Sequence, residues 1–215
     1  MPTRHESGVI VFEHPLIAHK LATIRDKHSG HRTFRAALNQ IAGLMVFEVT
    51  RELPTREVEI DTPMMTTRCT VLAGAITIVP VLRAGLGMID GILDVMPEAR
   101  VGHLGLARDE RTLEPHAYLN KLPHDLDNGP VILVDPMLAT GGSASAALSM
   151  LRQAGASDIR MICLVAAPEG IERLKRDHPG VTIYAAALDD RIDERGYILP
   201  GLGDAGDRMY GTVEG

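Results

Sequence analysis

An acid and a glycine-bearing loop follow one apolar run in the middle of the chain, and the loop could hold a phosphate group. The run is Val131–Val134, the acid is Asp135, and the loop closes with Thr140-Gly141-Gly142-Ser143. Four consecutive apolar residues, three of them β-branched, predict a buried strand. From Ala144 onward the apolar residues repeat at helical spacing, so a helix begins where the loop ends. Glycines and a helix start favour an anion, so we expect the loop to bind a phosphate, and Asp135 to hold hydroxyls or a hydrated metal.

This loop differs from the two commonest phosphate-binding loops. No Lys follows its glycines, as a P-loop requires, and the G-x-G-x-x-G spacing of a dinucleotide site is absent. The string instead resembles the ribose-phosphate loop of the type I phosphoribosyltransferases, in the form found in the uracil phosphoribosyltransferase branch. Its residues are Asp135, Pro136, Met137, Leu138, Ala139, Thr140, Gly141, Gly142 and Ser143.

The resemblance implies that this 135–143 loop wraps the 5-phosphate of phosphoribosyl diphosphate (PRPP), with Asp135 facing the ribose hydroxyls. Most members of the fold family carry two adjacent acids at this point, whereas Pro136 occupies the second position here. A glycine-rich turn that binds nothing is the alternative interpretation of the string alone.

Two arginines could bind the pyrophosphate of the same ligand. Arg83 follows a second apolar run, Ile76–Leu82, and precedes the glycine-bearing stretch Ala84–Gly87. A guanidinium can donate two parallel hydrogen bonds to a phosphate. The resemblance implies that Arg83 and Arg108 hold the pyrophosphate, and it makes Arg83-Ala84 a candidate for a non-proline cis peptide. The residue before Arg108 is Ala107, where the family often has an aromatic side chain, so a stacking role is not expected there.

A glycine-rich string near the C-terminus could bind a flat base. The stretch Gly196–Asp207 reads GYILPGLGDAGD and closely matches the uracil-binding segment of the uracil phosphoribosyltransferases. Uracil presents carbonyl acceptors and N–H donors that main-chain groups can recognise without side chains. By resemblance, Ile198, Gly203 and Ala205 contribute main-chain contacts to uracil, and Asp204 faces PRPP through Mg²⁺ or its waters. A glycine-rich tail that only packs on the sheet is the alternative.

Composition sets limits on the function. The chain has 215 residues, 45% hydrophobic and 23% charged, with a formal net charge of -6, which argues against a nucleic-acid surface. No stretch near Met1–Glu13 or elsewhere has the length of a signal peptide or membrane span, so a cytoplasmic protein is expected. Neither Cys69 nor Cys163 has metal-site spacing, and Cys163 is expected to be a reduced core thiol. The histidines are not expected to bind metal, and Asp189-Asp190 is expected to form a turn or cap.

The remaining pattern predicts an α/β fold with a central, mostly parallel sheet flanked by helices. Apolar strands near 76–82, 101–106, 131–134, 159–166 and 181–188 alternate with helices near 86–94, 143–154 and 168–177. A short strand near 9–12, helices near 15–25 and 33–53 and a hairpin near 57–73 precede them, and residues 107–130 are expected to form a long loop. We expect one domain over 1–215, with a core of about 74–188, N-terminal additions over 1–73 and a base-binding tail over 189–215.

The resemblance, which extends over nearly the whole chain, implies a uracil phosphoribosyltransferase. The implied reaction converts uracil and PRPP to UMP and pyrophosphate, with Mg²⁺ as cofactor bound mainly through PRPP and waters and with no metal site of the protein's own. The implied partners are PRPP, uracil, GTP as an activator and further copies of the chain in a homodimer or homotetramer. A PRPP-sensing regulatory protein with the same fold is the alternative, although the net charge of -6 disfavours a surface for nucleic acid.

Overall fold

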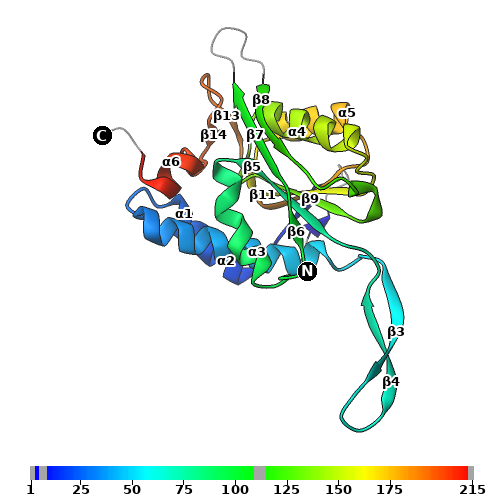
Figure 1. Ribbon diagram of the computed structural model, residues 1–215. Helices are drawn as coiled ribbons and strands as arrows, with labels where there is room; N and C mark the ends of the chain where they lie inside the picture. The colour runs from blue at the N-terminus through cyan, green and yellow to red at the C-terminus, as the bar shows by residue number, and fades with distance from the viewer. Residues whose placement is uncertain (1–2, 5–8, 109–114, 213–215) are drawn as a thin grey trace.

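The fold is built on one large sheet, most of whose strands run parallel. A computed structural model describes residues 3–4, 9–108 and 115–212 of the chain. The main path of the sheet is β1-β2-β12-β11-β9-β5-β7-β8, in which β1 and β8, the two outer strands, pair antiparallel to their neighbours (Figure 1). Its strands are β1 (Thr3–Arg4), β2 (Val9–Val11), β5 (Thr77–Leu82), β7 (His103–Arg108), β8 (Pro115–Lys121), β9 (Val131–Val134), β11 (Ile159–Ala166) and β12 (Thr182–Leu188). The short strands β6 (Arg100–Val101) and β10 (Met137–Leu138) pair with β5 and β11.

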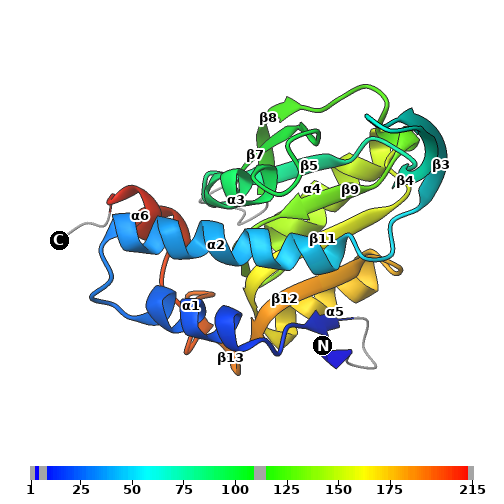
Figure 2. The ribbon, with the colours of Figure 1, turned by 90° about the horizontal axis from the view of Figure 1, so that it is seen from below.

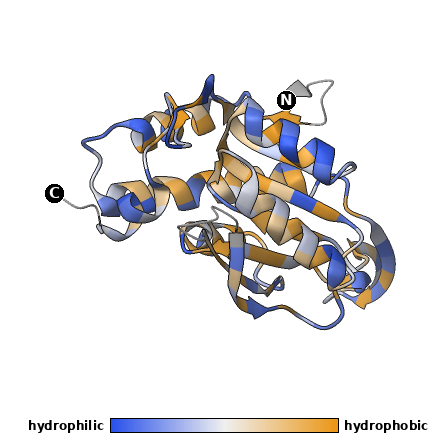
Figure 3. Cartoon of the chain, turned by 90° about the horizontal axis from the view of Figure 1, so that it is seen from above, coloured by the Kyte–Doolittle hydropathy of each residue, from blue (hydrophilic) through white to orange (hydrophobic). Residues whose placement is uncertain are grey.

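Helices cover both faces of this sheet because its strands are apolar on both sides. On one face lie α1 (Pro15–Arg25), α2 (His31–Val49) and α3 (Ile89–Leu93), and on the other α4 (Gly142–Gln153) and α5 (Pro168–Asp177) (Figure 2). Alternate residues of one strand enter the two cores: Ile132 packs with α2 and Leu133 with α4. The hydropathy colouring shows the same division, with hydrophobic strands at the centre and hydrophilic residues along the helices (Figure 3).

Most sequence-predicted elements are confirmed. The helix over 168–177 has the predicted bounds, and Pro168 occupies its first turn, where a missing N–H costs nothing. The helix predicted over 33–53 begins at His31 and ends at Val49, where the Thr50 hydroxyl donates to the carbonyl oxygen of Val46 at 2.9 Å. The 57–73 hairpin is present as β3 (Thr55–Asp61) and β4 (Thr66–Leu72), and it extends away from the body of the molecule (Figure 1).

The expected long loop over 107–130 is wrong in part. Residues 115–121 form β8, which pairs antiparallel with β7, and residues 126–128 form the 3₁₀ helix η2 (Leu126–Asn128). The described side chains of β8 are mostly exposed, because β8 is an edge strand held by its main chain. Without a buried face the strand has no apolar alternation, and periodicity therefore gave no sign of it.

Both cysteines lie in strands. Cys163 is a free, buried cysteine in β11, and burial raises the pKa of its thiol above the usual range. Cys69 in β4 is also free. No helix among residues 9–108 and 115–212 is long and apolar enough to cross a membrane.

Candidate active site

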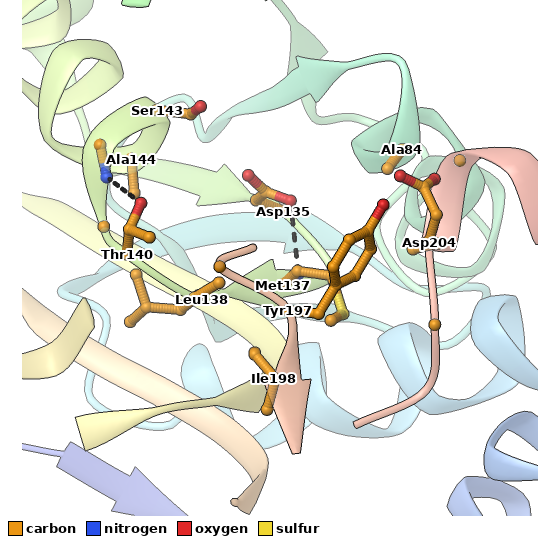
Figure 4. Close-up of a pocket in the computed structure, with 17 residues that line it drawn as sticks. Ala84, Asp135, Met137, Leu138, Thr140, Ser143, Ala144, Tyr197, Ile198 and Asp204 are labelled. Atoms are coloured by element: carbon orange, nitrogen blue, oxygen red, sulfur yellow. Dashed lines mark hydrogen bonds between the residues drawn. The ribbon is translucent and has the colours of Figure 1, made fainter. Parts of the chain in front are cut away.

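A cavity of about 300 Å³ lies where the carboxyl end of β9 meets the C-terminal tail. In an open parallel sheet, ligands bind at the carboxyl ends of the strands. The cavity brings together three parts of the chain that are far apart in the sequence: Ala84, residues 135–144 and residues 196–206 (Figure 4). Its lining residues are Ala84, Asp135, Met137, Leu138, Ala139, Thr140, Gly141, Gly142, Ser143, Ala144, Gly196, Tyr197, Ile198, Gly203, Asp204, Ala205 and Gly206. We call the last seven of these, between residues 196 and 206, the tail wall.

The 135–143 loop is held rigidly at the start of α4. Gly141 is the N-cap of α4 with a φ of 74°, a left-handed conformation that L side chains rarely adopt. A Cβ at this position would lie 3.0 Å from the carbonyl oxygen of Gly170, so the close approach of α5 also requires glycine. The N–H of Gly142 donates to Thr140 Oγ1 at 3.4 Å. The first turn of α4 contains no acidic residue, so its N–H groups and dipole remain available to an anion.

Asp135 lies at the end of β9 in a position that disfavours its charged form. Its N–H donates to the carbonyl oxygen of Ile162 at 3.1 Å, which continues the pairing of β9 with β11. Its carboxylate accepts the N–H of Met137 at 3.3 Å. Desolvation raises the pKa of Asp135 to about 7, and the hydrogen bond from Met137 opposes that rise. Carboxyl groups with strongly shifted pKa values are concentrated at functional sites. A bound ligand could supply the further hydrogen-bond donors that the charged form of Asp135 lacks.

The tail wall is formed by a short hairpin and the start of a helix. The strands β13 (Arg191–Ile192) and β14 (Ile198–Leu199) pair antiparallel, and α6 (Ala205–Tyr210) follows. Asp204 is the N-cap of α6, and its Oδ1 accepts the N–H of Asp207 at 2.9 Å. Figure 4 shows Asp204 beside Ala84, on the other side of Asp135 from Thr140. The wall consists largely of main chain because four of its seven residues are glycine or alanine.

Arg83 lies next to the cavity but does not line it. It follows β5 and precedes the 3₁₀ helix η1 (Ala84–Met88), and its Nη2 lies 3.4 Å from Asp207 Oδ1. Its side chain is 59% exposed, so it is accessible to a ligand that extends out of the cavity. The expected cis peptide is one residue earlier than the sequence candidate: Leu82-Arg83 is cis, whereas Arg83 already has the right-handed helical conformation of the η1 N-cap.

The other predicted residues have different outcomes. The backbone of Arg108 ends β7, but its side chain lies outside the described residues, as do Glu110 and Glu114. Pro136 is buried and does not line the cavity, and its carbonyl oxygen accepts the N–H groups of Leu164 and Val165 in β11. Ile198, Gly203, Asp204 and Ala205 all lie in the tail wall, where the loop residues face them.

Sequence reasoning missed several residues of this site. Tyr197 and Gly196 belong to the 196–207 string, and Ala84 belongs to the stretch after Arg83, but the sequence indicated no role for them. The signal that could have found them was their position within strings already chosen for their glycines. Arg25 and Arg208 lie outside the cavity and had no local signal, since Arg25 donates to the carbonyl oxygen of Gly201 and Arg208 to that of Asp26, 176 and 182 positions away.

The chain offers few ligands for a metal ion. In the described part of the chain no three His, Cys, Asp or Glu side chains are grouped to hold one. Among the described residues, Asp135 and Asp204 are the two that bring carboxyl groups to the cavity lining. Mg²⁺ commonly binds through one or two carboxylates with substrate phosphates and waters, and the cavity fits that mode.

Comparisons with known proteins agree with this geometry. A family model described as uracil phosphoribosyltransferase matches residues 11–212. A uracil phosphoribosyltransferase of Bacillus pumilus is 56% identical over 205 residues, which cover 95% of this chain and 98% of that protein. The solved structure of the AQ2163 protein from Aquifex aeolicus has a TM-score of 0.90 at 38% identity and covers 94% of this chain and 97% of that chain.

A more distant solved structure extends the likeness of fold. The adenine phosphoribosyl transferase of Trypanosoma brucei has a TM-score of 0.60 at 10% identity, over 90% of each chain. The central sheet and its flanking helices thus have the fold of the type I phosphoribosyltransferases. With the family model spanning residues 11–212, the chain belongs to the uracil phosphoribosyltransferase family of glycosyltransferase enzymes.

Proposed function

We propose that the chain transfers the phosphoribosyl group of PRPP to N1 of uracil, giving UMP and pyrophosphate. The observation that carries the proposal is the cavity in which the 135–143 loop faces the tail wall. A phosphate-binding loop and a main-chain surface suited to a flat base are the two halves that this reaction must bring together. Family membership supports the same reaction.

Each part of the site has a proposed role. Thr140–Ser143 bind the 5-phosphate at the start of α4, and Asp135 binds the ribose hydroxyls. Pro136, Met137, Leu138 and Ala139 complete the PRPP loop, of which all but Pro136 line the cavity. The main chain at Ile198, Gly203 and Ala205 binds uracil and aims its N1 at the anomeric carbon of the ribose.

The reaction needs positioning and charge stabilisation more than proton transfer. The bond between the anomeric carbon and the pyrophosphate oxygen breaks as the bond to uracil N1 forms, with positive charge developing on the ribose. The proton of uracil N1 leaves to water or to the departing pyrophosphate. Arg83 and Arg108 stabilise the departing pyrophosphate, and Asp204 faces the same ligand. Mg²⁺, when bound through PRPP oxygens and waters beside Asp135 and Asp204, adds positive charge at the pyrophosphate.

We propose further that the protein is cytoplasmic, that it forms a homo-oligomer and that GTP activates it. Two free cysteines support a reducing cytoplasm. A homodimer or homotetramer is supported by the projecting β3–β4 hairpin, whose turn exposes Met64 at 90% and Met65 at 69%. Activation by GTP rests on family membership alone, and it is tested by adding GTP to the assay below.

Turnover of radiolabelled uracil with PRPP and Mg²⁺ tests the proposed function. Cytosine, hypoxanthine and orotate serve as parallel controls for base selectivity. We expect uracil to be converted to its nucleotide and the three other bases to remain unconverted. Tight PRPP binding with no turnover of any of the four bases would reject the enzyme in favour of a PRPP-sensing regulator.

A further inference from the structure

One buried ion pair holds the turn at Gly201 from outside the cavity. Asp189, whose side chain is 2% exposed, follows β12, and its Oδ2 accepts the N–H of Gly201 at 2.8 Å. Arg25, the last residue of α1, donates from Nη1 to Asp189 Oδ2 at 2.9 Å and to the carbonyl oxygen of Gly201 at 2.8 Å. Its Nη2 donates to Asp189 Oδ1. Both main-chain polar groups of Gly201 are therefore fixed by the same pair.

Gly201 in turn fixes the part of the tail wall next to it. Its φ is 63°, and a Cβ there would lie 2.1 Å from the carbonyl oxygen of Ile198, so the chain folds tightly back on that residue. The N–H of Asp190 also donates to the carbonyl oxygen of Leu199 at 3.0 Å. Ile198 lines the cavity, so the position of Gly201 bears directly on this part of the cavity wall.

A second arginine continues the attachment on the other side of the turn. Arg208 of α6 donates from Nη1 to the carbonyl oxygen of Leu202 at 2.7 Å, and from Nη2 to that of Asp26 at 2.6 Å. Its guanidinium also lies over the ring of Phe34, 4.6 Å from the centroid. The tail wall is therefore tied to the end of α1 through consecutive residues, Gly201 and Leu202.

We propose that Arg25 and Asp189 are positioning residues for the base, acting through the main chain of Gly201. The inference rests on the proposed function. Neither side chain lines the cavity, so neither touches the base directly. A planar guanidinium that binds a buried carboxylate and a carbonyl oxygen together fixes both distance and angle, and a base read by main-chain groups depends on both.

The geometry separates the effect on the base from the effect on PRPP. The 135–143 loop is positioned by β9, β11 and the start of α4, and neither Arg25 nor Asp189 bonds to any of them through its side chain. Loosening the Arg25–Asp189 pair should therefore weaken uracil binding much more than PRPP binding, to which Asp204 is the one tail-wall residue assigned. A role limited to stability would not produce this difference.

The test uses two conservative variants and one matched control. In Arg25→Lys a single ammonium replaces the fork that reaches both Asp189 and Gly201, and in Asp189→Asn the shape remains but the charge is lost. The control is Arg160→Ala: Arg160 is 13% exposed, pairs with Asp158 at 3.6 Å and donates to the carbonyl oxygen of Val49. It lies near the start of β11, at the opposite end of that strand from Val165 and Ala166, which pair with β10 beside the cavity. For each variant the KM for uracil, the KM for PRPP, kcat and the melting temperature are measured.

We expect the KM for uracil to rise about tenfold or more in Arg25→Lys and Asp189→Asn, with the KM for PRPP changed by less than about threefold. Arg160→Ala should lower the melting temperature and keep both KM values. An unchanged KM for uracil in the two variants, or an equal rise in the Arg160→Ala control, would overturn the inference. If the unaltered chain fails to convert uracil at all, the proposed function itself is rejected. If the unaltered chain converts uracil and the two variants have the same KM for uracil, only the positioning role is rejected.

Discussion

The carboxylate of Asp135 and the N–H of Met137, 3.3 Å apart, form the one hydrogen bond that this carboxylate accepts within the described residues. No ion pair to Asp135 occurs in that part of the chain. The charged form is thus poorly compensated by protein groups, and burial raises the pKa of Asp135 to about 7. The ribose hydroxyls of PRPP would supply further donors.

The first prediction concerns the pH dependence of PRPP use. If the ionised Asp135 accepts hydrogen bonds from the ribose, kcat/KM for PRPP should fall about tenfold for each pH unit below the pKa of about 7. Steady-state kinetics at saturating uracil between about pH 5.5 and 8.5 measures this profile. Asp135→Asn should have a low and nearly pH-independent kcat/KM, and a profile in the variant like that of the unaltered chain would assign the titration to another group.

The same raised pKa has a consequence for stability. A carboxyl group whose folded pKa lies above its ordinary value favours the folded state fully below that ordinary value and loses this contribution as the pH rises through about 7. Asp135→Asn should therefore increase the free energy of unfolding of the unliganded chain at pH 8, by about 1 kcal/mol or more, and by less at pH 5. Urea denaturation at the two pH values tests this, and an equal change at both would contradict it.

The left-handed conformation of Gly141 gives a prediction with a built-in control. Gly141→Ala forces an L side chain to a φ of 74° and places its Cβ 3.0 Å from the carbonyl oxygen of Gly170. Gly180 has a φ of 93°, and a Cβ added there would meet no atom within 4 Å, so Gly180→Ala carries the strain without the contact. Gly180→Ala should lose about 1–2 kcal/mol of stability and Gly141→Ala more, and Gly141→Ala alone should raise the KM for PRPP. Chemical denaturation and kinetics of both variants separate the two effects.

Asp204 has two functions that substitution can separate. Its Oδ1 caps α6 by accepting the N–H of Asp207, and its carboxylate faces the cavity. Asp204→Asn keeps an acceptor for the cap, so its melting temperature should stay close to that of the unaltered chain while kcat/KM for PRPP falls at least about tenfold. Asp204→Ala should lose about 1 kcal/mol of stability in addition. Equal activity in Asp204→Asn and the unaltered chain would remove the charge from the proposed mechanism.

Arg108 is expected to act after PRPP has bound. Arg108→Ala should lower kcat more than it raises the KM for PRPP, because an arginine that reaches the pyrophosphate late contributes mainly in the transition state. Rapid-quench measurement of a single turnover would show the loss in the chemical step. An unchanged kcat with a raised KM for PRPP would instead place Arg108 in the initial binding of the ligand.

Local sequence patterns predicted the parts of the fold that are buried or that have distinctive turn residues. The strand over 131–134 and the helix over 168–177 have the predicted bounds, because four apolar residues and a first-turn proline are strong local signals. Strand β8 was missed because it is an exposed edge strand held by main-chain pairing. The cis peptide was placed one bond late: it is Leu82-Arg83, whereas the sequence candidate was Arg83-Ala84.

In the candidate site, too, residues that are close in the sequence were predicted and contacts between distant residues were not. The two strings that line the cavity were found from their glycines and from resemblance, since each is continuous in the sequence. The Arg25–Asp189 pair could not be found in this way, because its two residues are 164 positions apart. Asp189 was expected in a turn or cap, and it does hold a turn, but the partner that fixes it comes from α1.

The tail wall also limits how base preference could be redesigned. Its surface is mostly main chain, with Gly196, Gly203, Ala205 and Gly206 among its seven residues. Exchanging one side chain leaves the pattern of main-chain donors and acceptors in place, so single substitutions should abolish base use more readily than redirect it. A change of preferred base would require a different path of the backbone between β13 and α6, through insertion or deletion in that hairpin.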